Sequence, residues 1–319
     1  MRTTELGAKT LGVWTRQAAL AVQTPGQVDH LLASGVWQQL LPGVYADAGF
    51  ERDPLQRAVA AVMATGDAVA RAPGQRVRAL ACGRTAARVH GLPLIDDDDP
   101  ATGAAEHHID DVHTFRARSG RSLPVALGNR QLLRHRLSLL QDDVVRHPCG
   151  LLLTSPLRTA VDCTRLLTHE ATVCLLDDGL RRGLFTTADL EAAVSAREGW
   201  PGVRALAAAV RAADGRAESP GESLARMLLL PAVPGLVPQV RVKDDHGRVV
   251  ARLDLGEEQL LLGIEVDGKR GHAGAQMVAK DRRRDRRTQA LGWRVERCTW
   301  HELRTRPGEV LARVPRHAA

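Results

Sequence analysis

Aromatic residues and lysine are scarce in this chain of 319 residues. Phe, Trp and Tyr make up 3% of it, and lysine stands only at positions 9, 243, 269 and 280, so nearly all of the 44 basic residues are arginine. The hydrophobic fraction of 44% is nevertheless normal. The composition therefore excludes a wholly disordered chain and predicts a folded one.

Cysteine is also rare, and its spacing lacks any pairing pattern. The five cysteines are Cys82, Cys149, Cys163, Cys174 and Cys298. They form no C-x-x-C pair and their number is odd, which predicts reduced thiols. No apolar run approaches the length of a membrane span, and the N-terminus lacks the apolar core of a signal peptide. We therefore expect a cytoplasmic protein with no membrane partner.

The length predicts two or three domains, because a single core of this size is unusual. We expect a multidomain α+β or α/β chain divided into residues 1–50, 51–214 and 215–319. The formal net charge is +7. Residues 216–319 hold 20 basic and 14 acidic residues, a net +6, so nearly all of the excess lies in the last part. A polyanionic partner, if bound, is expected to bind mainly there.

Residues 11–48 have the pattern of a small helix-turn-helix followed by a wing. A short apolar-patterned helix is expected over residues 15–22. Thr24-Pro25 is a good N-cap and first-turn pair for a second helix, and Ser34-Gly35 is a good stop signal. Residues 36–45 then indicate two short strands around a Pro-Gly turn. The predicted fold of this part is a winged helix-turn-helix.

The segment SGVWQQLLPGVYA within this pattern resembles the N-terminal winged-helix domain of AbiEi-like antitoxins from abortive-infection systems. The resemblance implies operator binding through the helix over residues 25–33. That helix offers Gln27, Asp29 and His30 but no arginine or lysine, and phosphate contacts supply much of the affinity for DNA. Gln27 and His30 are the candidate DNA contacts, and a docking or dimerisation module is the alternative.

The middle region, residues 51–214, is predicted to be a mixture of helices and strands without an assigned role. Residues 82–93 are typical of a helix closed by glycine and proline, and are similar to the helix after the winged domain in the same antitoxin group. The acidic run 96–99 is expected to be a solvated loop and not a Ca²⁺ site. Arg158 and Asp162, spaced i, i+4 on a capped helix, predict a structural ion pair.

Two alternating runs in the last part, residues 252–255 and 260–267, predict a β-hairpin around the turn Gly256-Glu257-Glu258-Gln259. Their apolar positions share one face, which leaves Asp254, Glu265 and Asp267 on the other. Acidic residues are poor strand formers and repel one another. A solvated strand face is the simpler interpretation for any one of these carboxylates. The three together favour a hard divalent cation, Mg²⁺ or Mn²⁺, held by Asp254 and Glu265.

A helix is expected to begin at Ser219-Pro220, which puts Glu222 in its first turn. A strand and the hairpin follow, and then a helix over residues 275–291 and a strand over residues 293–300. Helix, antiparallel hairpin, helix and strand is the order of the PD-(D/E)XK nuclease core. The predicted fold of this part is a restriction-endonuclease-like mixed sheet flanked by helices.

The segments RLDLGEEQLLLGIEVDGKRGH and DRRRDRRTQALGWRVERCTWHEL resemble the very-short-patch-repair-like endonucleases and their bacterial relatives. The resemblance covers about residues 218–312. It implies that Asp254 is the metal-ligand acid, Glu222 the helical acid, Asp267 part of the family's D-G turn and His272 its histidine. The general superfamily signature has lysine where Asp267 stands. Cys298 alone cannot form the structural zinc site of the repair enzymes, so we expect no zinc.

The helix over residues 275–291 carries a strong excess of arginine. Positions 281, 284, 285 and 288 lie on one stripe, so acids can pair with Arg284 toward the sheet. Arginines at 282/286 and 283/287 form i, i+4 ridges directed outward. The candidate nucleic-acid contacts of this part are Lys269, Arg282, Arg283, Arg286 and Arg287. A solvated charged helix is the alternative, but it does not explain the sign bias.

These patterns predict metal-dependent hydrolysis of a nucleic-acid phosphodiester, as by a DNA endonuclease fused to a winged-helix module. The candidate catalytic residues are Glu222, Asp254, Glu265, Asp267 and His272. His272 is the candidate proton acceptor, because an imidazole titrates near neutrality. One alternative is a non-enzymatic AbiEi-like antitoxin or transcriptional regulator with a degenerate nuclease fold. Another is a toxin-type effector restrained by its own N-terminal domain. A toxin or antitoxin protein is therefore an expected partner beside nucleic acid.

Overall fold

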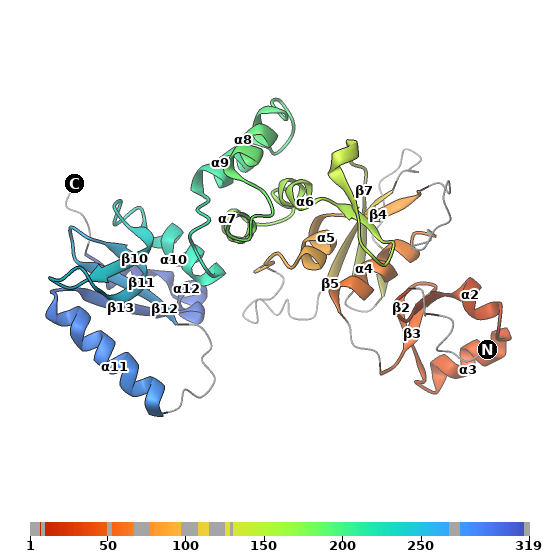
Figure 1. Ribbon diagram of the computed structural model, residues 1–319. Helices are drawn as coiled ribbons and strands as arrows, with labels where there is room; N and C mark the ends of the chain where they lie inside the picture. The colour runs from red at the N-terminus through yellow and green to blue at the C-terminus, as the bar shows by residue number, and fades with distance from the viewer. Residues whose placement is uncertain are drawn as a thin grey trace. The chain divides into compact units, whose positions relative to one another are not determined.

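The chain forms two compact units in a computed structural model (Figure 1). The first contains Met1–Thr168 and Ser195–Val203, and the second His169–Val194 and Arg204–Ala319. The structure describes residues 7, 10–49, 53–66, 77–96, 108–114, 125–127, 130–267 and 275–315, with the backbone alone at 108, 125–127, 130 and 275–282. The predicted mixed α/β class is observed. The predicted domain boundaries stay predictions.

The first sheet is antiparallel, and its strands lie in the order β1-β3-β2. Its elements are β1 Val13–Thr15, α2 Arg16–Leu20, α3 Pro25–Ala33, β2 Trp37–Leu41 and β3 Val44–Asp47. Thr24 caps α3 as predicted: its hydroxyl accepts a hydrogen bond from Gln27 N at 3.3 Å, and Gln27 Oε1 accepts one from Thr24 N at 2.8 Å. The predicted helix, helix and hairpin are therefore present. The three-residue strand β1 was missed, because so short a run shows no alternation.

The pleat of this small sheet divides its side chains between two cores. Trp14 packs with Trp37 and Tyr45 on the face toward α3, and the two indole rings are 5.0 Å apart. Val13, the neighbour of Trp14, belongs to a second core that continues into α4 and the second sheet. This shared core makes the first sheet and the second sheet parts of one unit.

The second sheet has six strands in the order β6-β7-β5-β4-β9-β8. Its strands are β4 Ala79–Ala81, β5 His108–Thr114, β6 Val125–Leu127, β7 Arg130–His135, β8 Val144–Arg146 and β9 Leu152–Thr154. The accompanying helices are α4 Pro54–Met63, α5 Gly83–His90, η3 Gln141–Asp143 and α6 Pro156–Cys163. Asp111 on β5 has no exposed surface and accepts hydrogen bonds from Arg84 of α5 and His135 of β7. This buried carboxylate ties one helix and two strands together.

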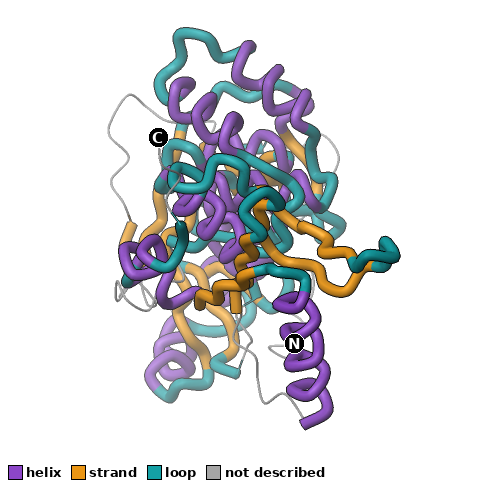
Figure 2. The backbone as a smooth tube through the Cα atoms, turned by 90° about the vertical axis from the view of Figure 1, so that its left-hand side faces the viewer, coloured by secondary structure: helices purple, strands orange, loops and turns teal. Residues whose placement is uncertain are grey.

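The second unit contains three helices and then the third sheet with its own helices. The first three helices are α7 His169–Arg181, α8 Thr187–Ser195 and α9 Val203–Ala212. The following elements are α10 Pro220–Leu229, β10 Val237–Lys243, β11 Val249–Glu257, β12 Leu262–Asp267, α11 Ala275–Ala290, β13 Arg294–Thr299, α12 Trp300–Thr305 and α13 Pro307–Ala312. The strands lie in the order β10-β11-β12-β13, and only the last pair is parallel. The long helix α11, blue in Figure 1 and purple in Figure 2, connects that parallel pair and contacts β11 and β13.

The predicted hairpin is present, but its turn was placed two residues too early. Gly256 and Gly263 face each other within the β11–β12 ladder, and the turn comprises residues 258–261. This ladder position requires glycine because β10 lies close to it: a Cβ on Gly256 would lie 2.9 Å from Val240 Cβ. The glycine taken as a turn signal thus serves close strand packing.

Among the described residues, no helix combines the length and the apolar character that crossing a bilayer requires.

The stability of the first unit should fall in mild acid because of His113. This residue of β5 is buried, and its Nδ1 accepts a hydrogen bond from Leu137 N at 3.0 Å. Burial, aided by Arg158 and His135, lowers the pKa of His113 from 6.5 to about 4. Between these two pH values the unfolded chain binds a proton at His113 and the folded chain does not. The contribution of neutral His113 to the free energy of unfolding is therefore complete above pH 6.5 and is lost as the pH falls toward 4.

Urea unfolding at pH 7 and pH 5 measures this effect. His113→Gln, which keeps an acceptor but cannot bind the proton, should lose less stability between the two pH values than the wild type. His30→Gln, at an exposed position, is the control and should match the wild type. Equal pH dependence in wild type and His113→Gln would contradict the assignment.

Candidate active site

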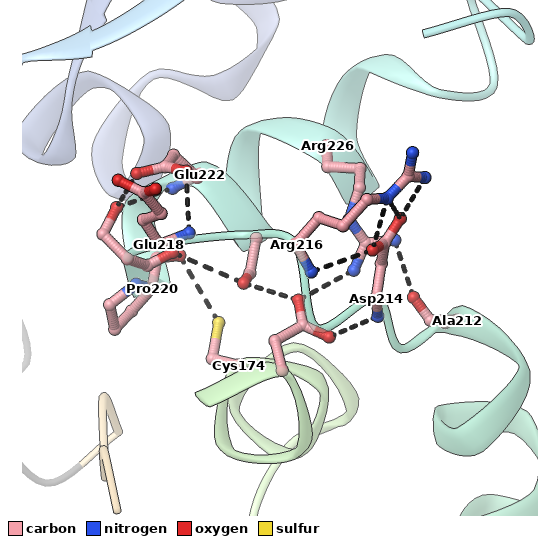
Figure 3. Close-up of polar contacts among 11 residues, drawn as sticks. Cys174, Ala212, Asp214, Arg216, Glu218, Pro220, Glu222 and Arg226 are labelled. Atoms are coloured by element: carbon pink, nitrogen blue, oxygen red, sulfur yellow. Dashed lines mark hydrogen bonds and ion pairs between the residues drawn. The ribbon is translucent and has the colours of Figure 1, made fainter. Parts of the chain in front are cut away.

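Glu222 lies in the first turn of α10, as predicted, and is held there by several donors. Ser219 caps the helix by accepting from Glu222 N at 3.2 Å, and its hydroxyl donates to Glu222 Oε1 at 2.9 Å. Glu218 N and Gln239 Nε2 each donate to Glu222 Oε2 at 2.8 Å. Figure 3 shows this turn of the chain around Glu218, Pro220 and Glu222. The carboxylate, 6% exposed, therefore has a fixed position.

The start of α10 packs directly on β12. A Cβ on Gly221 would lie 2.9 Å from Val266 Cγ1, so only glycine allows this approach. The preceding strand residue, Glu265, instead contacts Arg284 of α11. Consecutive strand residues point to opposite faces, so α10 and α11 cover opposite faces of the third sheet. Glu265 therefore lies on the α11 face of the sheet near the end of β12, and Glu222 belongs to the helix that covers the other face.

Asp254 lies on β11, beside β12. It comes one residue before Leu255, whose register partner on β12 is Ile264. The Asp254 carboxylate accepts a hydrogen bond from Val266 N at 2.8 Å, which connects the strands just beyond their last backbone pair. The side chain is thereby held at the point where β11 and β12 separate.

Glu265 on β12 is buried between two arginines. Arg284 of α11 approaches both carboxylate oxygens to 2.9 Å, and Arg297 of β13 approaches Oε2 to 3.0 Å. Arg297 also donates to both oxygens of Asp285 on α11, at 3.0 and 3.1 Å. The predicted stripe of α11 is therefore confirmed in its main feature: Arg284 and Asp285 turn toward the sheet and pair with opposite charges. The contacts of Arg297 with Glu265 and Asp285 were not predicted from the sequence. The alternating pattern of its short strand was the signal that could have placed its side chain on this face.

The three acids are electrostatically coupled. Burial raises the pKa of Glu222, of Asp254 and of Glu265 above the ordinary range. The charge of Asp254 adds to the rise in both Glu222 and Glu265. For Glu265 burial outweighs the opposite effect of Arg284 and Arg297. The raised pKa values therefore come first from burial of the three carboxyl groups, and the charge of Asp254 adds to them.

This chemistry fits a hard divalent cation, but no metal-binding group is preassembled. Carboxylate oxygens are the ligands that Mg²⁺ and Mn²⁺ prefer, and Asp254 and Glu265 supply them from adjacent strands. In the part of the chain that the structure describes, no three His, Cys, Asp or Glu side chains are grouped to hold a metal ion. Asp254 and Glu265 are the residues that could hold such a cation, since they supply carboxylate oxygens from adjacent strands.

A second buried carboxylate anchors the helix that carries Glu222. Asp177 of α7, 1% exposed, accepts hydrogen bonds from Ser223 Oγ at 2.6 Å, Arg226 Nη2 at 2.8 Å and Asp214 N at 2.6 Å. Arg226 also donates to Ala212 O at 2.6 Å (Figure 3). Sequence reasoning missed this group. Its signal was the acid of the Asp177-Asp178 pair that falls on the apolar side of α7.

Several predicted site residues lie elsewhere or outside the description. His272 and Lys269 lie outside the described residues, as does the side chain of Arg282. Asp267 is half-buried at the end of β12, opposite Thr299 of β13. The ridge arginines with described side chains are all exposed: Arg283, Arg286 and Arg287.

The candidate DNA contacts in α3 differ from each other. Gln27 is exposed, but its side chain takes part in the capping box of α3. His30 is exposed on the same helix.

In the middle region, the predicted ion pair of Arg158 with Asp162 is confirmed at 3.0 Å. Arg158 also contacts Asp143 at 2.7 Å, so the pair belongs to a larger structural group.

Comparison with known proteins finds relatives of this chain whose activity is not described. No model of a known protein family matches the chain. Two similar proteins are an uncharacterized protein of Mycobacterium tuberculosis strain CDC 1551 / Oshkosh and an uncharacterized protein of strain ATCC 25618 / H37Rv. Each is 29% identical over 241 residues, which cover 75% of this chain and 81% of the relative. The likeness therefore extends over most of both chains.

Removing the charge of Asp177 should destabilise the second unit strongly. Asp177→Asn leaves the buried guanidinium of Arg226 without a counter-charge, which typically costs about 3–5 kcal/mol. The neighbouring Asp178 pairs with the more exposed Arg181 and Arg182, so Asp178→Asn should cost about 1 kcal/mol or less. Urea unfolding measures both variants. Similar losses would show that burial of Asp177 does not anchor α10.

Proposed function

We propose that the C-terminal part of the chain is a metal-dependent nucleic-acid phosphodiesterase of the DNA-endonuclease kind, fused to a winged-helix DNA-binding module. The observation that carries the proposal is the position of Asp254. Its carboxylate accepts a hydrogen bond from Val266 N at 2.8 Å where β11 and β12 separate, and its charge adds to the burial that raises the pKa of Glu222 and of Glu265. Asp254 and Glu265, from adjacent strands, supply the carboxylate oxygens that a divalent cation prefers. They also occur in the element order of a PD-(D/E)XK core.

Asp254 and Glu265 are the proposed ligands of Mg²⁺ or Mn²⁺, with Glu222 acting through water. When bound, such an ion polarises the phosphate and lowers the pKa of a coordinated water. The chain's own residues orient two of these acids: Val266 N holds Asp254, and Ser219 and Gln239 hold Glu222. Fixed positions matter because catalysis depends on alignment before the reaction.

The proton of the attacking water is assigned to His272. An imidazole is half-protonated near neutral pH, so it can accept this proton and release it again. His272 follows Asp267 by five residues in the sequence. Asp267 is proposed either to add to the metal ligands or to set the turn that precedes His272.

Nucleic acid is proposed to bind along α11. Arg283, Arg286 and Arg287 are exposed on this helix, while Arg284 is committed to Glu265. Exposed guanidinium groups bind backbone phosphates without regard to sequence. Lys269 and Arg282 extend the same basic segment in the sequence. Gln27 and His30 of α3 are the proposed contacts of the winged-helix module.

The second candidate is a non-enzymatic AbiEi-like antitoxin or transcriptional regulator with a toxin partner. One observation favours it: both oxygens of Glu265 are occupied by Arg284 and Arg297. An acid neutralised by arginines is what a degenerate nuclease platform would contain. The two candidates thus differ in which cation Glu265 pairs with when nucleic acid is bound.

Nuclease activity of the full chain tests the proposal. With Mg²⁺ or Mn²⁺, the wild type should nick at least one of supercoiled, mismatched or single-stranded DNA or RNA. Asp254→Asn should abolish nicking and, when binding is measured without metal, leave it equal or tighter, because it removes an anion that holds the metal and repels phosphate. Glu257→Gln, on the same strand outside the acid group, is the control and should retain activity. Absence of cleavage on every substrate would leave the regulator as the function.

The salt dependence of binding tests the role of α11. Arg283→Ala with Arg287→Ala should reduce the slope of log K against log salt by up to about two, since each phosphate contact contributes about one. Arg181→Ala with Arg182→Ala removes the same charge from α7 and should leave the slope unchanged. Fluorescence anisotropy of a labelled duplex gives the slopes. A slope equal to that of the wild type in the α11 variant would make this ridge a solvated face.

A further inference from the structure

The arginines on Glu265 are unusually accessible for partners of a buried acid. The Glu265 side chain is 8% exposed, whereas Arg284 and Arg297 are 26% and 35% exposed. At three other buried acids the guanidinium is less exposed: Arg84 on Asp111 is 8% exposed, Arg226 on Asp177 is 6% exposed, and Arg57 and Arg88 near Asp110 are 15% and 13% exposed. The pairing at Glu265 is therefore open to solvent from the arginine side.

These two arginines also have other possible acceptors. Arg297 already divides its bonds between Glu265 and Asp285, and Arg284 lies 3.7 Å from Asp285. A phosphate group presents the same planar pair of oxygen acceptors to a guanidinium as a carboxylate does. The exposed Arg283 and Arg287 neighbour Arg284 on α11, so a backbone bound there would bring phosphates close to it. Phosphate can thus compete with Glu265 for Arg284 and Arg297.

A divalent cation and the two guanidinium groups compete for the same oxygens. Arg284 contacts both oxygens of Glu265, and Arg297 contacts one of them. A cation at Glu265 would lie within a few ångströms of two positive charges, and their repulsion is strong in a half-buried site. Metal binding at Glu265 therefore requires that at least one arginine turn away.

We propose that Arg284 and Arg297 form a latch on Glu265 that nucleic-acid phosphate opens, so that metal binding and nucleic-acid binding reinforce each other. The latch rests on the proposed function, because it assigns Glu265 as a metal ligand. It makes Arg284 and Arg297 positioning residues that act through Glu265. By linkage, the metal must also tighten nucleic-acid binding by the same factor. The free protein would then bind little metal, and the metal site would fill when nucleic acid binds.

Calorimetric titration of the full chain with Mn²⁺ alone, without nucleic acid, tests the latch. Arg284→Gln and Arg297→Gln each remove one competing charge and should raise the Mn²⁺ affinity on the order of tenfold. Arg294→Gln is the matched control, because Arg294 lies on the same strand β13 but pairs with Glu296. This control should bind Mn²⁺ as the wild type does. Melting temperatures identify any variant that has lost its fold, and either glutamine variant alone suffices.

A second measurement follows the coupling itself. Anisotropy of a labelled DNA duplex, at matched ionic strength with and without Mn²⁺, should show tighter binding with the metal in the wild type. The gain should be smaller in Arg284→Gln, because its metal site is already open.

The outcomes separate the latch from the proposed function. If the wild type binds Mn²⁺ and cleaves DNA but the glutamine variants bind the metal no tighter, the latch is wrong and the phosphodiesterase remains. If the glutamine variants bind Mn²⁺ more tightly while no protein cleaves nucleic acid, the latch stands and the activity fails. If no protein binds Mn²⁺ and none cleaves nucleic acid, both proposals are wrong; if none binds Mn²⁺ alone but the wild type cleaves, only the latch is wrong.

Discussion

The fold depends on carboxylates that are buried against arginine. Asp111 with Arg84 joins a helix to the second sheet, and Asp177 with Arg226 joins α7 to α10. Removing either partner would strand a charge away from water, which costs far more than the pair itself contributes. Arginine suits this arrangement better than lysine, because its planar fork satisfies two acceptors at once.

The candidate site uses the same interaction in a less closed form. Asp177 fixes α10 from one side, and α10 presents Glu222 toward Asp254. Glu265 is held from the other face of the sheet by arginines that solvent can reach. The two pairs therefore differ in the accessibility of the guanidinium group, which is 6% exposed at Asp177 and 26% and 35% exposed at Glu265.

Much of the third sheet and part of the site could be predicted from spacing alone. Ser219 and Pro220 predicted the start of α10 and the place of Glu222, and alternation predicted that Asp254 and Glu265 lie on paired strands. The helical stripe predicted that Arg284 turns inward. The turn of the hairpin was placed wrongly, because Gly256 packs against Val240 of a neighbouring strand. That contact is invisible in the local sequence.

The sequence by itself determined caps, strand alternation, the helical stripe of α11 and the sign of its charge. Each of these depends on residues a few positions apart, whose geometry the backbone imposes. Only the tertiary structure decided which charges meet. Arg226 reaches Asp177 across 49 residues, and Arg284 reaches Glu265 across 19. Every arginine has the same local chemistry, so its partner is chosen by the packing that buries one particular acid beside it.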